Sequence, residues 1–340
     1  MKAVVFREGS QWAVEEVPTP KPGPGEVLLK VVRTGVCGTD EHLLHGGFIA
    51  KLPLIPGHEI LGEVAEHGDG VSEPAIGTLV TVDNTVHCGD CAPCLDGRPL
   101  FCENFISLGC NAPGGFAEYV AVRAAKTFAA DGIDVTTAGL AEPTACALHG
   151  VDVLDIQPGS RVLIFGAGPT GLILAQLLRA SGASFVAMAA PTASKLDLAR
   201  ELGIDATVQM DRQDADAAEN ELRALAPDGF DAVVEATGST AVLELGIRLT
   251  ATGGTIMVYG LAAESAVAQI RPYEIFSREL TIKGSFAQAN TVGRSMRILG
   301  SGAIRTDGII TDVVGFDDFA RALENLHDSS QIKTVFEPGR

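Results

Sequence analysis

The sequence predicts an α/β protein with two domains, a mostly β domain followed by a doubly wound parallel sheet. Length is the first observation behind this prediction, because 340 residues, 46% of them apolar, exceed what one compact core of ordinary size holds. The hydrophobic pattern supplies two more. Short strands broken by turns fill residues 1–152, and strands alternating with amphipathic helices fill residues 153–286.

The first domain shows apolar strands between turn signals such as PTPKPGPGE at 18–26. Strands are expected at 3–6, 27–36, 59–67 and 78–82. The pattern is typical of a compact β domain.

The second domain begins after Gln157-Pro158-Gly159, where strands start to alternate with helices. This alternation predicts a parallel sheet with helices on both faces. Strands are expected at 161–165, 184–190, 206–210, 230–237, 254–260 and 280–286, and helices at 172–182, 194–203, 216–226 and 243–250. The remaining residues 287–340 are too few for a further domain. We expect this segment, helix-rich with a last strand at 334–338, to return to the first domain.

Composition and charge exclude several classes of protein. A mean hydropathy of +0.23 excludes general disorder. The net charge of −18 argues against nucleic acid or an anionic membrane as the main partner. The opening residues alternate like a strand and lack the apolar core of a secretory signal. We therefore expect a cytoplasmic protein that acts on a small molecule, without nucleic-acid or membrane partners.

A glycine-rich turn follows the first strand of the second domain. Gly166, Gly168 and Gly171 form G-x-G-x-x-G, with Pro169 and Thr170 between the last two glycines. The first glycine permits a tight turn, the second lets a pyrophosphate approach the backbone, and the third lets helix and strand pack closely. A plain strand–turn–helix is the alternative. The context favours a Rossmann dinucleotide site.

The end of the next strand bears on the choice of cofactor. NAD sites usually carry Asp or Glu there, about 20 residues past the loop, to bind the ribose hydroxyls. This chain has Ala190 at that place, while Thr192, Ser194 and Lys195 offer donors and positive charge. NADP is therefore favoured over NAD, and a site that tolerates both is the alternative.

Four cysteines lie within one short lobe at about 84–105, namely Cys88, Cys91, Cys94 and Cys102. Two-residue spacers let neighbouring thiolates turn toward one ion, and four sulfurs complete a tetrahedral zinc site. Disulfides are the alternative, but the spacing and a reducing compartment disfavour them. The lobe predicts a structural zinc with no open coordination position.

A second, dispersed set consists of Cys37, His58, Glu59 and Glu142. One thiolate, one imidazole and one or two carboxylates suit a zinc ion with an exchangeable position, as catalysis requires. Taken singly, Cys37 is equally typical of a buried core thiol and His58 of a hydrogen-bonded turn histidine. Spacing alone leaves both interpretations open.

Together these motifs resemble the zinc-dependent medium-chain dehydrogenases, the family of alcohol, sorbitol and threonine dehydrogenases. The resemblance runs through nearly the whole chain, in the order GVCGTDEH, PGHEILGEV, the four-cysteine lobe, GGFAEY, AEPTACALHG, GAGPTG, VEATG and KTVF. It implies a GroES-like catalytic domain, a Rossmann cofactor domain and two zinc ions per subunit, one catalytic and one structural.

The resemblance also implies roles for single residues. Cys37, His58 and Glu59 match catalytic-zinc ligands, and Glu142 matches a glutamate that meets this metal directly or through water. Thr39 and His42 match a proton relay; the alternative is that Thr39 caps a helix that begins near Asp40 and His42 is a surface helix residue. The residues matched to cofactor contacts are Gly166, Gly168, Pro169, Thr170, Gly171, Ala190, Thr192, Ser194, Lys195, Thr237, Gly260, Ser285, Phe286 and Lys333.

The expected substrate is a sugar alcohol or a secondary alcohol, oxidised to a ketose or ketone. Sorbitol itself is disfavoured, because Leu43 replaces a tyrosine of sorbitol dehydrogenase and Ala287-Gln288 replaces an Arg-Tyr pair, leaving Gln288 and Asn290 to bond other hydroxyls. L-Threonine 3-dehydrogenase and aldose dehydrogenase activities are the alternatives, and a non-catalytic NADP-binding sensor is a remote one. By analogy we expect a homo-oligomer, a dimer or tetramer, with the strand near 254–260 at the sheet edge.

Overall fold

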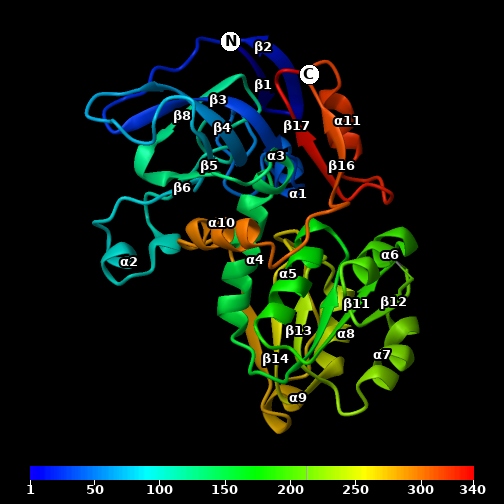
Figure 1. Ribbon diagram of the computed structural model, residues 1–340. Coiled ribbons are helices and arrows are strands. Elements are labelled where there is room, and N and C mark those ends of the chain that lie inside the picture. The colour runs from blue at the N-terminus through cyan, green and yellow to red at the C-terminus, as the bar shows by residue number, and fades with distance from the viewer. Residues whose placement is uncertain (212) are drawn as a thin grey trace. The chain divides into compact units, whose positions relative to one another are not determined.

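A computed structural model of the chain describes residues 1–211 and 213–340, which form two compact units (Figure 1). Unit 1 comprises residues 1–145, 288–302 and 306–340, and unit 2 comprises residues 146–287 and 303–305. The domain limits expected from the sequence, at residues 152 and 286, stay predictions.

Unit 1 is built on a seven-stranded sheet in the order β16-β17-β3-β4-β5-β9, with β8 paired to β3. Its long central strands are β3 (Glu26–Gly35) and β4 (Glu59–His67), which are antiparallel. The other strands are β5 (Leu79–Val82), β8 (Tyr119–Arg123), β9 (Thr127–Ala129), β16 (Ile310–Val314) and β17 (Lys333–Phe336). Two hairpins complete the β structure, β1 (Lys2–Arg7) with β2 (Gln11–Glu16) and β6 (Thr85–Val86) with β7 (Ile106–Ser107).

Aromatic packing ties the C-terminal segment to unit 1. Phe116 lies in edge-to-face contact with Phe319 and Phe336, at ring-centroid distances of 5.1 and 5.5 Å. All three side chains are fully buried, so each contributes about 2–3 kcal/mol of burial free energy. The segment after residue 306 thus completes both the sheet and the core of this unit.

Unit 1 also contains the short helices α1 (Gly38–Leu44), α2 (Ala92–Leu95), α3 (Val135–Ala138), α10 (Val292–Ser301) and α11 (Phe319–Glu324). Its 3-10 turns are η1 (Pro99–Phe101) and η2 (Ala124–Lys126). Helix α4 (Ala141–Leu154) begins in unit 1 and ends in unit 2. Helix α1 begins at Gly38 with Cys37 as its N-cap residue, so Thr39 is not the cap.

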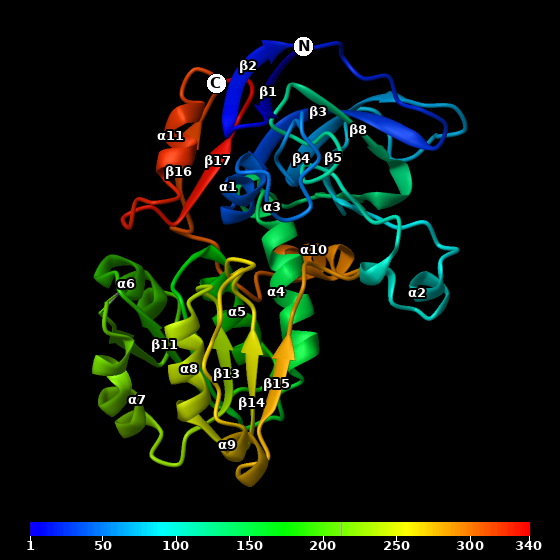
Figure 2. The same ribbon diagram turned by 180° about the vertical axis from the view of Figure 1, so that it is seen from behind.

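Unit 2 is a six-stranded, wholly parallel sheet in the order β12-β11-β10-β13-β14-β15, and Figure 2 shows β13, β14 and β15 side by side. The strands are β10 (Arg161–Phe165), β11 (Phe185–Ala190), β12 (Ala206–Gln209), β13 (Phe230–Glu235), β14 (Thr250–Val258) and β15 (Thr281–Gly284). The helices are α5 (Pro169–Ala180), α6 (Ala193–Glu201), α7 (Glu219–Leu225), α8 (Thr240–Leu249) and α9 (Pro272–Ser277), with the turn η3 (Ala215–Ala218). This confirms the predicted doubly wound sheet.

Two expectations about strands need correction. The segment 254–260 is not at the sheet edge, because β14 pairs with β13 on one side and with β15 on the other. The edge strands of this sheet are β12 and β15. Strand β16 was not predicted, since Thr311 and Asp312 interrupt its apolar pattern. Within the described residues, the search for a helix long and apolar enough to cross a membrane finds none.

Candidate active site

The positions matched to cofactor contacts in unit 2 gather at one edge of its sheet. Five parallel strands end there, and their carboxyl ends are followed by Gly166, Ala190, Thr237, Gly260 and Ser285. Strand order reverses between β10 and β13, which is where open parallel sheets bind their ligands. The fold therefore brings these residues, which are distant in the sequence, to the carboxyl edge of the sheet.

The glycine loop has the geometry that a pyrophosphate needs. Gly166 has a φ of +112°, which residues with a Cβ rarely adopt. A Cβ added to Gly171 would lie 2.0 Å from the Gly166 oxygen, whereas one added to Gly168 would meet no atom within 4 Å. Helix α5 starts at Pro169, directly after the N-cap residue Gly168. The N-terminal N–H groups of a helix suit an anion, and the space beside Gly168 is open.

Ala190 ends β11 and is buried, with no carboxylate in the turn that follows. Thr192 is the N-cap residue of α6, Ser194 and Lys195 lie in its first turn, and Lys195 is half-buried. The structure thus places the three predicted contacts for a 2′-phosphate on one short stretch beside the glycine-loop strand β10.

Sequence reasoning missed Glu235, which fixes the turns after β13 and β14. Its buried carboxylate accepts the backbone N–H of Thr237 at 2.6 Å and also the Thr237 hydroxyl. Its backbone oxygen accepts the N–H groups of Tyr259 and Gly260 at 2.9 and 2.8 Å. The acidic residue in VEATG was the available signal. The Ser285 hydroxyl is buried and makes no hydrogen bond to the residues that the structure describes, and Phe286 is 39% exposed.

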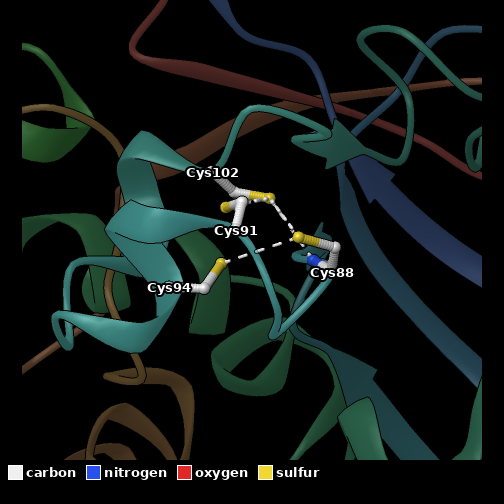
Figure 3. A group of neighbouring side chains, drawn as sticks. All are labelled: Cys88, Cys91, Cys94 and Cys102. Carbon is white, nitrogen blue, oxygen red and sulfur yellow. Dashed lines mark hydrogen bonds between the residues drawn. The ribbon is translucent and has the colours of Figure 1, made fainter.

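The four cysteines of the predicted zinc lobe converge (Figure 3). Sulfur–sulfur distances are 3.5 Å for Cys88–Cys102, 3.8 Å for Cys91–Cys102 and 4.0 Å for Cys88–Cys94. A tetrahedron with Zn–S bonds of about 2.3 Å has edges of about 3.8 Å. All of this fits one four-sulfur zinc ion.

A second candidate metal group in unit 1 consists of Cys37, His58 and Glu59, whose ligand atoms lie within 4.8 Å of one another. Cys37 follows β3 and caps α1, His58 precedes β4, and Glu59 begins β4. Because β3 and β4 are paired at Gly35 and Glu59, the ends of the two strands bring these residues together. Residues 21 positions apart in the chain thereby become neighbours.

Asp40 stands behind two of these residues and was missed as a site residue. It is fully buried, and its Oδ2 accepts the Cys37 N–H at 2.9 Å. Its Oδ1 lies 3.5 Å from Nδ1 of His58, so the other ring nitrogen is left for a metal. Burial alone would lower the pKa of His58, but Cys110 and Asp40 raise it well above its ordinary value.

Lys333 is paired with a residue of the candidate metal group. Its ammonium is 3% exposed and contacts Glu59 Oε1 at 2.5 Å and the Val36 oxygen at 2.9 Å. Burial would lower the pKa of Lys333, but Glu59 first, and then Cys37 and Glu142, raise it. The structure therefore shows Lys333 as the counter-ion of the metal group, and its contact with a cofactor stays a prediction.

The remaining predicted residues lie around this group. Glu142, in the first turn of α4, is 7% exposed and acts electrostatically on Lys333. Thr39 and His42 lie one turn apart on α1, and the Thr39 hydroxyl is 3.7 Å from the Cys37 sulfur. Gln288 is different: it is fully buried and donates to Asp83 and Thr85, so it is not available to a substrate hydroxyl.

The second group fits a metal ion by an observation independent of spacing. Oε2 of Glu59 is buried and makes no hydrogen bond within the described part of the chain. A buried carboxylate oxygen without a partner is costly unless a cation or donor meets it. Thiolate, imidazole and carboxylate are ligands that zinc accepts, and three protein ligands leave the fourth position open.

Comparison with known proteins agrees with this geometry. Residues 23–132 match the family profile "Alcohol dehydrogenase GroES-like domain" and residues 169–300 match "Zinc-binding dehydrogenase". D-arabinitol dehydrogenase 1 of Uromyces fabae is 41% identical over 339 residues, covering 99% of this chain and 97% of that protein. D-altritol 5-dehydrogenase of Agrobacterium fabrum is 35% identical, covering 91% and 89%. A zinc-binding dehydrogenase from Sinorhizobium meliloti 1021, crystallised with NADP, superposes with a TM-score of 0.92 at 35% identity and covers 99% of both chains.

Proposed function

The chain belongs to the zinc-dependent medium-chain dehydrogenases, and from that premise we propose that it oxidises a free sugar alcohol to the corresponding ketose with NADP. It is an alcohol/polyol dehydrogenase. One observation carries the proposal. The ligand atoms of Cys37, His58 and Glu59 lie within 4.8 Å of one another, and the buried Oε2 of Glu59 receives no hydrogen bond from the described residues.

We propose that each subunit holds two zinc ions. Cys88, Cys91, Cys94 and Cys102 hold the structural ion. Cys37, His58 and Glu59 hold the catalytic ion. We propose that Glu142, which acts electrostatically on Lys333, meets this ion directly or through water. Bound at the second site, zinc supplies a Lewis acid that lowers the pKa of an alcohol hydroxyl, and the dinucleotide accepts the hydride.

The chain's own residues then handle the proton. The Thr39 hydroxyl, next to the Cys37 sulfur, accepts the proton of the substrate hydroxyl and passes it on. His42 lies one turn further along α1, is half-buried and reaches solvent, so its imidazole delivers the proton to water. In the family the cofactor ribose links the two groups, and we propose the same order here.

The substrate proposal rests on the relatives and on the donor set. D-Arabinitol and D-altritol dehydrogenases are similar along nearly the whole chain. The metal group itself, with one exchangeable position, suits a substrate that binds through a hydroxyl oxygen. We therefore propose an open-chain pentitol or hexitol as substrate, with a secondary carbinol as the reacting group.

NADP is proposed over NAD because Ala190 takes the place of an acidic residue. A carboxylate there would bind the ribose 2′-hydroxyl and repel a 2′-phosphate. Thr192, Ser194 and Lys195 supply hydrogen-bond donors and one positive charge instead. The structural relative crystallised with NADP supports this choice.

We further propose that the protein is a dimer, or a tetramer of such dimers, joined through unit 2. Strand β15 is an edge strand of its sheet, so one side of its backbone is unpaired in the described structure. Large apolar side chains are exposed nearby in the chain, with Val267 at 81%, Tyr273 at 76% and Phe276 at 80%.

We also propose a cytoplasmic location, because the four zinc-binding thiolates require reducing conditions.

The test is a substrate panel with two cofactors. Pentitols, hexitols, simple secondary alcohols, L-threonine and D-glucose are each offered with NADP and with NAD, and the absorbance of the reduced nicotinamide is followed. Reduction with one polyol, faster with NADP, is the expected result. A preference for NAD would refute the cofactor proposal alone, and activity with L-threonine alone would replace the proposed substrate.

The same panel separates an enzyme from a non-catalytic sensor. Zinc per chain is measured beside it. Two zinc ions with no turnover would indicate a substrate outside these classes. One zinc ion with no turnover would favour a protein that binds NADP without catalysis.

A further inference from the structure

The carboxylate of Glu59 lies close to the backbone of Gly35 on the neighbouring strand. Gly35, the last residue of β3, is paired across the sheet with Glu59, the first residue of β4. A Cβ atom placed on Gly35 would stand 1.9 Å from Oε2 of Glu59 and 2.7 Å from its Cδ. The Glu59 carboxylate therefore occupies space that any other residue at position 35 would fill with its own side chain.

Lys333 lies on the other side of the same carboxylate. It begins β17, which pairs with β3 so that Val335 lies opposite Gly35. Its Cε would be 2.9 Å from the same added Cβ, and its Nζ binds Oε1 of Glu59 at 2.5 Å and the Val36 oxygen at 2.9 Å. Since Lys333 takes Oε1, Oε2 is the carboxylate oxygen left with unused lone pairs.

We propose that Gly35 and Lys333 are positioning residues that hold Glu59 as a ligand of the metal bound by Cys37 and His58. The inference rests on the metal site of the proposed function. Gly35 acts by leaving out a Cβ, so that the carboxylate lies against the backbone of β3. Lys333 acts by fixing one oxygen, so that the carboxylate does not rotate away from the metal.

The positive charge of Lys333 also stabilises the carboxylates of the ligand group. Glu59 and Glu142 are both buried acidic residues, and both act electrostatically on Lys333. Like charges oppose one another strongly when water is excluded. The buried ammonium offsets one of these charges, so the ligand set is held together before a cation arrives.

The experiment measures metal binding rather than turnover. Cobalt replaces zinc at the second site, its visible absorption reports thiolate and carboxylate ligation, and competition with a coloured chelator gives the affinity. Gly35→Ala is expected to weaken cobalt binding by about tenfold to hundredfold and to change the spectrum, the range typical for residues that orient ligands. Zinc at the four cysteines is expected to stay.

Gly38→Ala is the matched control, because a Cβ at Gly38 meets no atom within 4 Å although this residue adjoins Cys37. It is expected to keep the wild-type cobalt affinity and spectrum. Lys333→Met is the second test variant, of similar length without the charge. It is expected to weaken cobalt binding as well, and it keeps the proposal testable if Gly35→Ala fails to fold.

A double-mutant cycle with Glu59→Ala separates positioning from general damage. If Gly35 acts through Glu59, the added methyl costs no further cobalt affinity once the carboxylate is gone. An equal loss with and without Glu59, or wild-type affinity and spectrum in both Gly35→Ala and Lys333→Met, overturns the inference alone. Wild-type protein that binds metal only at the four cysteines would overturn the proposed metal site together with the inference.

Discussion

Asp40 shows how a residue outside the ligand set controls it. Its carboxylate holds the backbone of Cys37 with Oδ2 and faces the ring of His58 with Oδ1. Asp40→Asn keeps the shape but removes the charge that orients and polarises the imidazole. We expect metal affinity at the catalytic site to fall about tenfold to hundredfold, as measured by chelator competition.

Glu41→Gln is the control for this variant. Glu41 lies on the same helix, its carboxylate is 36% exposed, and it pairs with the exposed His327. It is expected to leave metal affinity unchanged. Equal metal affinity in Asp40→Asn and wild-type protein would show that Asp40 serves the fold and not the metal.

Lys195 is the residue on which cofactor choice is expected to depend most. One ion pair with a 2′-phosphate is worth about 1–2 kcal/mol in a half-exposed place, which is roughly five- to thirtyfold in affinity. Lys195→Ala should therefore raise the KM for NADP by roughly tenfold and leave the KM for NAD nearly unchanged. Steady-state kinetics with each cofactor check this.

The control for Lys195 lies on the same helix. Arg200, in the last turn of α6, binds Asp197 and Thr207, and Arg200→Ala should alter neither KM. A parallel rise in both KM values for Lys195→Ala would show that the lysine does not distinguish the two cofactors.

Single residues were predictable from the sequence where the chemistry is local. The spacing of Cys88, Cys91, Cys94 and Cys102 is itself the signal, because neighbouring thiolates fold onto one ion without help from distant strands. Gly35 and Lys333 were not predictable as partners of Glu59. They meet through the register of three strands, of which β17 lies more than 250 positions after β3 and β4 in the chain.

Elements were predictable where the hydrophobic period was clear. The six strands of unit 2 and four of its helices overlap the expected ranges, because buried parallel strands read as continuous apolar runs. Helix α9 was not predicted. The order of strands is not local information. For that reason β14 was expected at the edge, while the structure places β15 outside it.

The contact between β16 and α11 gives a prediction for pH. Asp312 accepts hydrogen bonds from Arg321 and Asn325, each at 2.9 Å. Burial alone would raise the pKa of Asp312, but the hydrogen bonds from these two side chains lower it below its ordinary value of 3.8. A carboxyl group whose pKa is lower in the folded state stabilises the fold above its unfolded pKa, and this contribution is lost as the pH falls through the folded value.

Asp312→Asn is therefore expected to lower the free energy of unfolding by about 1 kcal/mol at neutral pH. The difference from wild type should shrink as the pH falls below the unfolded value near 3.8. Urea unfolding at several pH values measures it. A difference that stays constant with pH would show that the carboxylate charge has no part in this contact.

At the scale of the whole molecule, charge and apolar surface make opposite demands. A net charge of −18 keeps copies of the chain apart in general. An exposed edge strand with apolar neighbours favours pairing at one place, and a closed two-fold contact would cover it. Ile282 lies on that strand, with 38% of its surface exposed.

Ile282→Lys tests the proposed dimer at this edge (Figure 2 shows β15). A lysine on each of two paired edges would bring like charges together and leave apolar contacts unmade, so the variant should be monomeric or bind its partner at least tenfold more weakly. Light scattering after size exclusion gives the mass of each form. Ile76→Lys is the matched control, because Ile76 in unit 1 is 64% exposed and distant from this strand in sequence. A wild-type monomer would refute the dimer itself, whereas a dimer that survives Ile282→Lys would place the contact on another surface.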